Sequence, residues 1–272
     1  MVFPSHRVSL GGSHLMLHGL YVSGLAAVGQ SVKLDVIANN LANVNTPGFR
    51  RDSLSFQERL VEALEDKPDL QYYNLLVDRY GGAPFIDDVS WDQNSGSFEQ
   101  TDREFDFAIV GEGFFGVKDL QTDKVYYTRS GNFTLDGNGR VVTQNGKYQL
   151  LNQDGAGVNM DPSAGLTDLR VDEEGQFFQG DALLHQFMVR DFSDKDNLRK
   201  HGHNLYQYTG SETGVSQGYR VVQGALESST VNTISEMVEM IKATRAVESN
   251  LQMVTMQDGT LDRLINGFGR PS

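Results

Sequence analysis

The chain has 272 residues, a formal net charge of −13 at pH 7 and no cysteine. A balance this acidic disfavours nucleic acids and anionic membrane surfaces as partners, because both attract basic patches. The lack of cysteine excludes disulfides and thiolate metal ligands. No apolar stretch approaches the ~20 residues of a membrane helix, and no cleavable signal peptide is recognisable, so we expect no integral membrane protein.

The first predicted element is a helix that extends to about residue 44, with an apolar face that begins near Leu25. Apolar residues recur at steps of three and four, as on one face of a helix: Leu34, Ile37, Leu41 and Val44. Asn45-Thr46-Pro47-Gly48 ends this helix. The residue before a proline avoids helical geometry, and glycine tolerates a positive φ.

An asparagine cluster marks the end of this helix, formed by Asn39, Asn40, Asn43 and Asn45. Inside a helical bundle such amides would fix the register between helices at some cost in stability. At a free helix end they would only cap the last turn and meet water. Both interpretations remain open from the sequence.

Residues 62–106 hold twelve carboxylates and three basic side chains. We expect this acidic segment to be a solvated, exposed region rather than a cation site. Beyond it the chain is rich in short apolar runs separated by turn signals. Asp136-Gly137, Asn138-Gly139 and Asn145-Gly146 are strong hairpin signals between strand-forming residues. The middle of the chain is therefore predicted to be an antiparallel β domain, with strands at 183–192 and, last, at 219–223.

Gly111, Gly113 and Gly116 follow an apolar strand in a G-x-G-x-x-G pattern. Nucleotide binding there would need a helix to begin at the loop, so that its N-terminus faces the phosphates. A strand, a turn and a strand follow instead, so we interpret the glycines as a tight bend that lets Phe114 and Phe115 pack.

Two histidine pairs, His14 with His18 and His201 with His203, have no third ligand nearby and are better explained as surface residues. No set of nucleophile, base and oxyanion donors is recognisable. We therefore expect no enzyme activity, no catalytic residues, no cofactor and no metal site.

The last predicted element is one long helix over residues 231–268. Its apolar and small residues recur with a heptad-like period, typical of a coiled coil. Thr233 is a predicted N-cap with Glu236 completing a capping box, and Gly267, Gly269 and Pro271 stop the helix. Helical faces at the two ends of a chain must pair with each other or with other copies. The predicted subunit-packing residues are Leu34, Ile37, Asn40, Leu41, Asn43, Val44, Met237, Ile241, Val247, Leu251, Val254, Leu261 and Ile265.

Residues 35–49, Asp-Val-Ile-Ala-Asn-Asn-Leu-Ala-Asn-Val-Asn-Thr-Pro-Gly-Phe, resemble the N-terminal motif of the bacterial flagellar basal-body rod and hook protein family. Residues 106–115 and 127–136 resemble that family's middle domain. Residues 222–232 and 239–248 resemble the lead-in to its terminal helix and the helix itself. The resemblance covers both ends and the middle of the chain in the right order.

The resemblance implies an α+β fold in which the N- and C-terminal helices form a coiled-coil layer outside which a mainly antiparallel β domain lies. The expected boundaries are residues 1–48 with 233–272 for the helical coiled-coil domain, 49–84 with 224–232 for a connecting segment, and 85–223 for the β-rich outer domain. We expect residues 1–45 and 233–272 to be mobile in the isolated subunit and to fold on assembly, because an isolated helix is marginally stable.

The resemblance also implies a structural subunit that polymerises into the axial drive shaft between motor and hook. The implied partners are further copies, other rod and hook subunits, and the flagellar type III export apparatus, which would export the chain without a cleaved signal to the periplasm-spanning rod. The length fits a rod subunit with one middle domain better than a hook subunit with two. The long, acidic segment 56–92, the lead-in Glu227-Ser-Ser-Thr-Val-Asn232 and the opening residues 1–18 depart from the family pattern and favour a proximal-type over a distal rod protein. The alternatives are a hook-type subunit and, in another class, a secreted carbohydrate-binding or enzymatic β domain with helical tails.

Overall fold

The computed structural model describes residues 11–58, 84–160, 169–180, 182–192, 194–202, 204–210, 214–215 and 218–268. The chain is an α+β protein that divides into two compact units. The helical unit comprises the described parts of Met1–Leu41, Asp52–Trp91 and Asn232–Ser272, and the β unit comprises the described parts of Ala42–Arg51 and Asp92–Val231.

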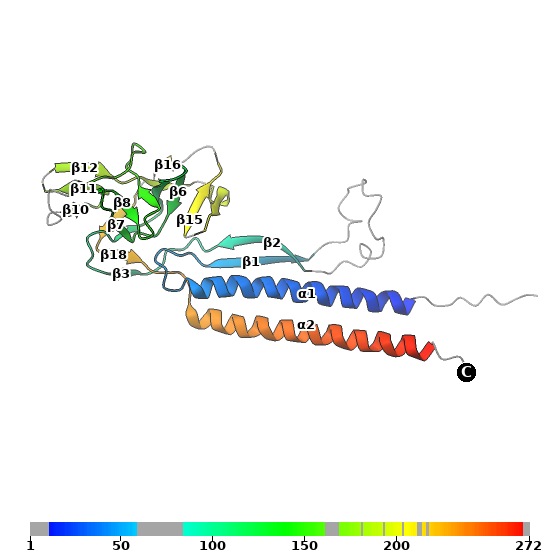
Figure 1. The fold of residues 1–272 in the computed structure, drawn as a ribbon. Coiled ribbons are helices and arrows are strands. Elements are labelled where there is room, and N and C mark those ends of the chain that lie inside the picture. The colour runs from blue at the N-terminus through cyan, green and yellow to red at the C-terminus, as the bar shows by residue number, and fades with distance from the viewer. Residues whose placement is uncertain are drawn as a thin grey trace, which may run out of the picture. The chain divides into compact units, whose positions relative to one another are not determined.

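The helical unit contains the helices α1, Gly11–Ala42, and α2, Thr233–Phe268, which lie side by side (Figure 1). They run antiparallel. Lys33 Nζ lies 3.0 Å from Glu239 Oε2 near the start of α2. Gly19, nearly four turns earlier on α1, is adjacent to the side chain of Gln257 near the far end of α2. α1 begins well before the apolar face that starts near Leu25.

The helical unit also holds a β hairpin. Its strands β1, Asp52–Glu58, and β2, Pro84–Trp91, pair antiparallel with Asp52 opposite Trp91 and a bulge between Ser55 and Phe56. Residues 62–83 of the acidic segment lie outside the described residues.

The ends of the helices confirm most of the signals in the sequence. α1 stops before Asn43-Val-Asn-Thr-Pro-Gly48, where Gly48 has a φ of +66°. α2 spans the predicted range, but its N-cap is Asn232 rather than Thr233. The Asn232 side-chain oxygen accepts a hydrogen bond from the Ser235 amide at 3.1 Å. Thr233 is the first helical residue, and Glu236 turns inward instead of completing a capping box.

The β unit is built from short antiparallel strands (Figure 1). Its main sheet has the order β14-β15-β6-β5-β9-β8-β7, with β13 paired to β5 and β16 paired to β13. The bounds are β5 Phe114–Asp119, β6 Val125–Thr128, β7 Phe133–Leu135, β8 Val141–Thr143, β9 Tyr148–Leu150, β13 Val189–Asp191, β14 Leu198–Lys200, β15 Leu205–Tyr208 and β16 Gly214–Val215. A 3₁₀ turn at Lys195–Asn197 leads into β14.

Three smaller sheets complete the described β unit. One has the order β10-β11-β12, and the others pair β17 with β4 and β18 with β3. The bounds are β3 Phe98–Gln100, β4 Phe107–Val110, β10 Leu169–Val171, β11 Gln176–Gln179, β12 Ala182–Gln186, β17 Arg220–Gln223 and β18 Ala225–Glu227.

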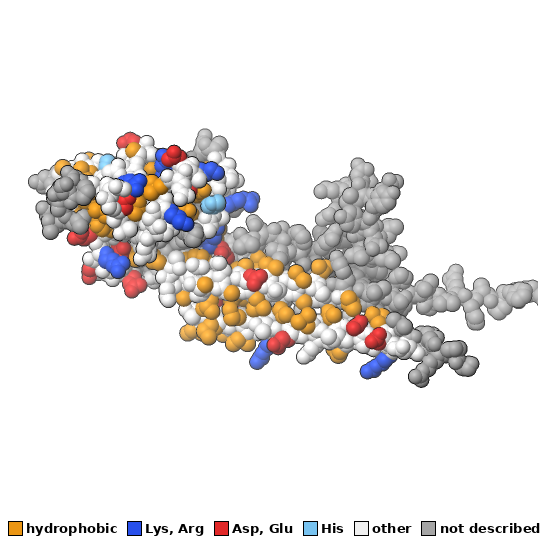
Figure 2. Space-filling view, in the orientation of Figure 1, with side chains coloured by type: hydrophobic (Ala, Val, Ile, Leu, Met, Phe, Trp, Pro, Cys, Tyr) orange, Lys and Arg blue, Asp and Glu red, His pale blue; other side chains and the backbone are white. Residues whose placement is uncertain are grey.

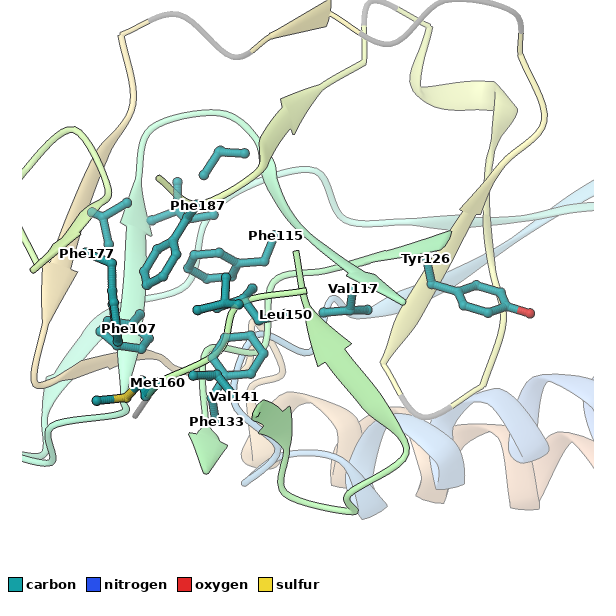
Figure 3. Close-up of a cluster of buried hydrophobic side chains, with 14 of the residues drawn as sticks. Phe107, Phe115, Val117, Tyr126, Phe133, Val141, Leu150, Met160, Phe177 and Phe187 are labelled. Carbon is teal, nitrogen blue, oxygen red and sulfur yellow. The ribbon is translucent and has the colours of Figure 1, made fainter. Parts of the chain in front are cut away.

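One aromatic cluster forms the core of the β unit (Figure 3). The ring of Phe115 meets Phe133 edge-on with centroids 5.6 Å apart, and Phe107 meets Phe187 edge-on at 5.1 Å. Edge-to-face packing suits the negative face and positive edge of aromatic rings. The residues drawn together come from strands far apart in the sequence, so the cluster fixes the fold of the whole β unit.

The predicted hairpins are confirmed, with two corrections elsewhere. β7 and β8 pair across the turn at residues 136–140, and the glycine loop at 111–113 joins β4 to β5 without a helix. The strand predicted at 183–192 is two strands, β12 and β13, because the chain changes partner there: β12 pairs with β11, Phe187 bridges to Asn152, and β13 pairs with β5. The strand at 219–223 is β17 and is not the last one, since β18 follows before α2.

Candidate assembly surface and buried charge cluster

An apolar surface covers the outer side of the first two turns of α2. We call it the α2 apolar face; its residues are Ile234, Met237, Val238 and Ile241, of which Ile234 is 76% and Ile241 54% exposed. The opposite side of the same turns is closed, since Glu236 and Ala243 are buried. In the view of Figure 2, hydrophobic side chains run along both helices with few charged groups among them. Exposed apolar patches of this kind mark binding surfaces.

The predicted packing residues of α2 fall on two sides of the helix. Met237, Ile241 and Leu251 are exposed, whereas Val247, Val254 and Leu261 are half-buried on the side of Ala243. A seven-residue repeat drifts by about 20° per heptad around a straight α-helix. One predicted stripe therefore spreads over two faces, one turned inward and the other outward. The Ile265 side chain lies outside the described ones.

The packing residues predicted on and after α1 are less exposed. Ile37 and Asn40 are buried, and four others are half-buried: Leu34, Leu41, Asn43 and Val44. Leu34 and Leu41 therefore keep part of their apolar surface accessible in the single chain.

Asn40 is fully buried in the helical unit and acts as a bridge between elements. Its amide nitrogen donates to the Asp52 carbonyl at 2.9 Å, and its side-chain oxygen accepts from the Asp52 amide at 2.9 Å. A side-chain amide thereby pairs with the start of β1 as a strand would. The same nitrogen lies 3.4 Å from Glu236 Oε2 in the first turn of α2. Asn40 thus joins the end of α1, the start of β1 and the start of α2, and it is not a solvated cap.

A buried charge cluster in the β unit joins three distant parts of the sequence. Glu227, at the end of β18, lies between two arginines: its Oε1 is 2.9 Å from Arg50 Nη2 and its Oε2 is 3.3 Å from Arg129 Nη1. The three side chains are each no more than 2% exposed. Glu227 Oε1 also accepts a hydrogen bond from the Gly96 amide at 2.9 Å.

Arg129 extends the charge cluster to the loop after β4. Its Nη1 donates to the Ile109 carbonyl at 2.9 Å and its Nη2 to the Gly111 carbonyl at 2.6 Å. Burial lowers the pKa of the Arg129 guanidinium, and the Glu227 carboxylate partly offsets that effect. Arginine keeps its charge in proteins. The cluster therefore pairs the carboxylate of Glu227 with two guanidinium groups, and we call it the ion triad.

Backbone hydrogen bonds surround the charge cluster. The Gly48 amide donates to the Glu227 carbonyl at 2.7 Å, and the Thr230 amide donates to the Phe49 carbonyl at 3.0 Å. A Cβ on Gly48 would lie 2.5 Å from the Arg129 carbonyl carbon, so glycine alone fits at this close approach. The segment after α1 is therefore packed directly against the segment before α2.

Lys200 and Asn204 also hold the segment after α1. The Lys200 ammonium donates to the Arg50 carbonyl and lies 4.3 Å from the centroid of the Phe49 ring. The Asn204 amide nitrogen donates to the Pro47 carbonyl at 2.8 Å. Both residues come from the β14–β15 hairpin, so the Pro47–Arg50 turn is fixed to the main sheet as well as to β18.

Sequence reasoning did not find the charge cluster. Arg129 and Glu227 were noted only within longer motifs and Arg50 was not noted, because no periodicity or spacing relates residues 50, 129 and 227. The available signal was a charged residue inside an otherwise apolar or small-residue strand, Ala225-Leu-Glu227. Among the described residues, no group of three or more potential ligands is placed to hold a metal ion. None of the helices described is long and apolar enough to span a membrane.

Three family models match the chain, in order along the sequence. Residues 20–50 match the model described as flagella basal body rod protein. Residues 108–178 match the flagellar hook protein FlgE/F/G D1 domain. Residues 222–267 match the C-terminal model of the flagellar basal body rod FlgEFG proteins. The three matches contain Arg50, Arg129 and Glu227 respectively.

Similar proteins align over almost their whole length. The flagellar basal-body rod protein FlgG of Bacillus subtilis strain 168 is 30% identical over 269 residues, which cover 92% of this chain and 99% of that protein. FlgG of Buchnera aphidicola subsp. Acyrthosiphon pisum is 30% identical over 265 residues, with the same coverage. The flagellar basal-body rod protein FlgF of Mesorhizobium japonicum is 28% identical and covers 94% of this chain and 100% of that protein.

Proposed function

The chain belongs to the flagellar basal-body rod protein family and is a structural subunit of the rod, and on that premise we propose that it polymerises through its terminal helices into the axial drive shaft between motor and hook. The observation that carries this proposal is the α2 apolar face, which a single chain leaves exposed. A contiguous group of four exposed apolar side chains on a helix marks an interaction surface, because covering it removes apolar area from water.

The energetics favour another subunit as the cover. Fully burying a side chain of the size of isoleucine, valine or methionine contributes about 1.5–3 kcal/mol. The α2 apolar face offers four such side chains on two turns, and Leu251, Met253 and Met256 add further exposed apolar surface along the helix. If the face of one chain packs on a different surface of the next, the contact does not close on itself and a helical tube grows.

In this proposal α1 and α2 of successive subunits form a coiled-coil layer. The predicted packing residues then divide by role. Val247, Val254 and Leu261 pack towards α1 of the same chain, and Met237, Ile241 and Leu251 pack towards other chains. The proposed partners are other rod and hook subunits, as well as the type III export apparatus that delivers the chain without a cleaved signal to the periplasm-spanning rod. A proximal-type position in the rod is part of the same proposal.

The test replaces one exposed apolar residue by a charge. Ile241→Asp is expected to keep the helical and β circular dichroism of the purified chain, because Ile241 is exposed there. Its amount in isolated basal bodies is expected to fall at least about tenfold, which corresponds to 1.4 kcal/mol. Gln252→Asp, at an exposed polar position of the same helix, is the matched control. Normal incorporation of Ile241→Asp would rule out the α2 apolar face as an assembly surface.

The alternative class is not favoured. A secreted carbohydrate-binding or enzymatic β domain would keep its activity without the terminal helices and would be absent from basal bodies. The similar proteins reported above are all named rod proteins, and this chain aligns with nearly their whole length. Detection of the chain in purified basal bodies separates the two classes directly.

A further inference from the structure

The polypeptide passes between the two units four times. The crossings are at Leu41–Ala42, Arg51–Asp52, Trp91–Asp92 and Val231–Asn232. The two units are joined at these four covalent connections. How the β unit holds its side of the crossings therefore bears on assembly.

On the β-unit side the crossing segments are hydrogen-bonded to one another. The Arg51 amide donates to Thr230 Oγ1 at 2.9 Å, and the Asp92 amide donates to the Arg51 carbonyl at 2.8 Å. Together with the bonds of Gly48 to Glu227 and of Thr230 to Phe49, these contacts tie residues 48–51, 92 and 227–230 into one cluster of segments. We call it the junction.

Glu227 is the residue that connects most of the junction segments to one another, while Lys200 and Asn204 hold residues 47–50 to the main sheet. Its backbone carbonyl holds Gly48, its carboxylate holds Arg50 and the Gly96 amide, and the same carboxylate holds Arg129 on the main sheet side. Segments before β3, after α1 and before α2 thus share one side chain.

We propose that Glu227 is a positioning residue that holds the segment after α1 and the segment before α2 at a defined spacing during assembly. This inference rests on the proposed rod function. It assigns to the ion triad of Arg50, Arg129 and Glu227 a role in assembly that is separate from the stability of the aromatic core.

Loss of the Glu227 charge is expected to disturb the triad more than loss of either arginine charge. Removing the Glu227 carboxylate takes away the counter-charge that is paired directly with both buried guanidinium groups, which is strongly unfavourable. Removing Arg50 leaves a neutral pair of Glu227 with Arg129. The junction is therefore expected to loosen most when Glu227 loses its charge and less when Arg50 does.

The experiment measures hydrogen exchange of backbone amides in the full-length chain. The junction amides are those of Gly48, Arg51, Asp92 and Thr230, and the reference amides in the β core are those of Gly116 and Leu151, which donate to Met188 and Gly116 carbonyls at 2.9 Å. The variant is Glu227→Gln. The matched control is Glu99→Gln, at an exposed position on β3, the strand that pairs with β18.

We expect the junction amides of Glu227→Gln to exchange at least about tenfold faster than in the control, because local opening sets their protection. The Gly116 and Leu151 amides keep their rates. In cells that carry Glu227→Gln as the sole copy, we expect less of the chain in isolated basal bodies. The amount falls at least about tenfold, which corresponds to 1.4 kcal/mol.

Three results would overturn the inference: unchanged junction protection, an equal loss of protection in junction and core, or normal incorporation into basal bodies despite a loosened junction. If Glu227→Gln does not fold, Arg50→Met provides the test, since it leaves a neutral pair of Glu227 with Arg129. This variant is expected to accelerate hydrogen exchange selectively at the Gly48 and Arg51 amides. Uniform acceleration, or none, would refute the inference. Absence of the unmodified chain from basal bodies would refute the rod function instead, while the exchange measurement would still report on the junction.

Discussion

The two units of this chain bury apolar surface to very different extents. The β unit encloses an aromatic core in which Phe107, Phe115 and Phe187 are essentially inaccessible to water. In the helical unit the described hydrophobic residues that are buried are only Ala27, Ile37 and Ala243, two of which are alanines. The same unit exposes Val28 and most of the large apolar residues of α2.

The difference indicates where each unit obtains its stability. The β unit satisfies its own hydrophobic side chains, so it can keep its fold whether or not the chain is assembled. The helical unit leaves its apolar surface uncovered, and most helical stability in proteins comes from packing such a surface. In a rod subunit, the stability of the helical unit would therefore depend on assembly, whereas the stability of the β unit would not.

The largest expected effect is a loss of stability of the β unit alone. Phe115→Ala removes a fully buried ring that contacts Phe133 and Phe187, and it should destabilise the β unit by about 3–5 kcal/mol. Urea unfolding followed by near-UV circular dichroism measures the loss. Phe98→Ala, at a 43% exposed ring on β3, is the control and should change the unfolding free energy little. Equal effects of the two changes would contradict the contrast between core and surface.

An intermediate effect is expected inside the helical unit. Asn40→Leu removes the side-chain amide that pairs with both backbone groups of Asp52, and an unpaired buried polar group costs about 1–3 kcal/mol. Hydrogen exchange of the last turns of α1 and the first turns of α2 should accelerate, and rod assembly should fall. Ala38→Leu, at an exposed position two residues earlier, is the control. Unchanged exchange and normal assembly with Asn40→Leu would show that the bridge to β1 and α2 is dispensable.

The smallest effect concerns pH. Hydrogen bonds from Lys242 and Lys33 lower the pKa of Glu239 from 4.5 to about 2. Because the pKa is depressed in the folded chain, the contribution of Glu239 to stability is fully present above pH 4.5 and is lost as the pH falls towards 2. Both lysine contacts are partly exposed, so salt should weaken them.

The measurement compares the thermal unfolding of the helical signal of the unmodified chain and of Glu239→Gln between pH 6 and pH 2.5. The destabilisation caused by Glu239→Gln should be largest at pH 6 and should shrink at the acid end of the range. Glu248→Gln, an exposed position on the same helix, serves as the control for loss of a negative charge. A difference that grows as the pH falls would contradict the assigned role of Glu239.

The sequence by itself determined the elements whose signals are local. The period of apolar residues over 233–268 predicted α2, Pro47 and Gly48 predicted the end of α1, and the Asp-Gly and Asn-Gly pairs predicted the hairpin of β7 and β8. Each of these signals lies within a short stretch of sequence. The helix follows from the spacing of its apolar residues, and the turns follow from the backbone preferences of Pro, Gly, Asn and Asp.

The tertiary structure alone decided which charges are buried and which apolar side chains are left exposed. Arg50, Arg129 and Glu227 meet although 79 or more positions separate each pair in sequence, and no local preference encodes that meeting. Likewise, one heptad pattern predicted a single stripe on α2, and the pairing with α1 divided it into an inner and an outer face. Burial depends on what packs on the other side of a residue, and that is supplied by the folded chain rather than by neighbours along it.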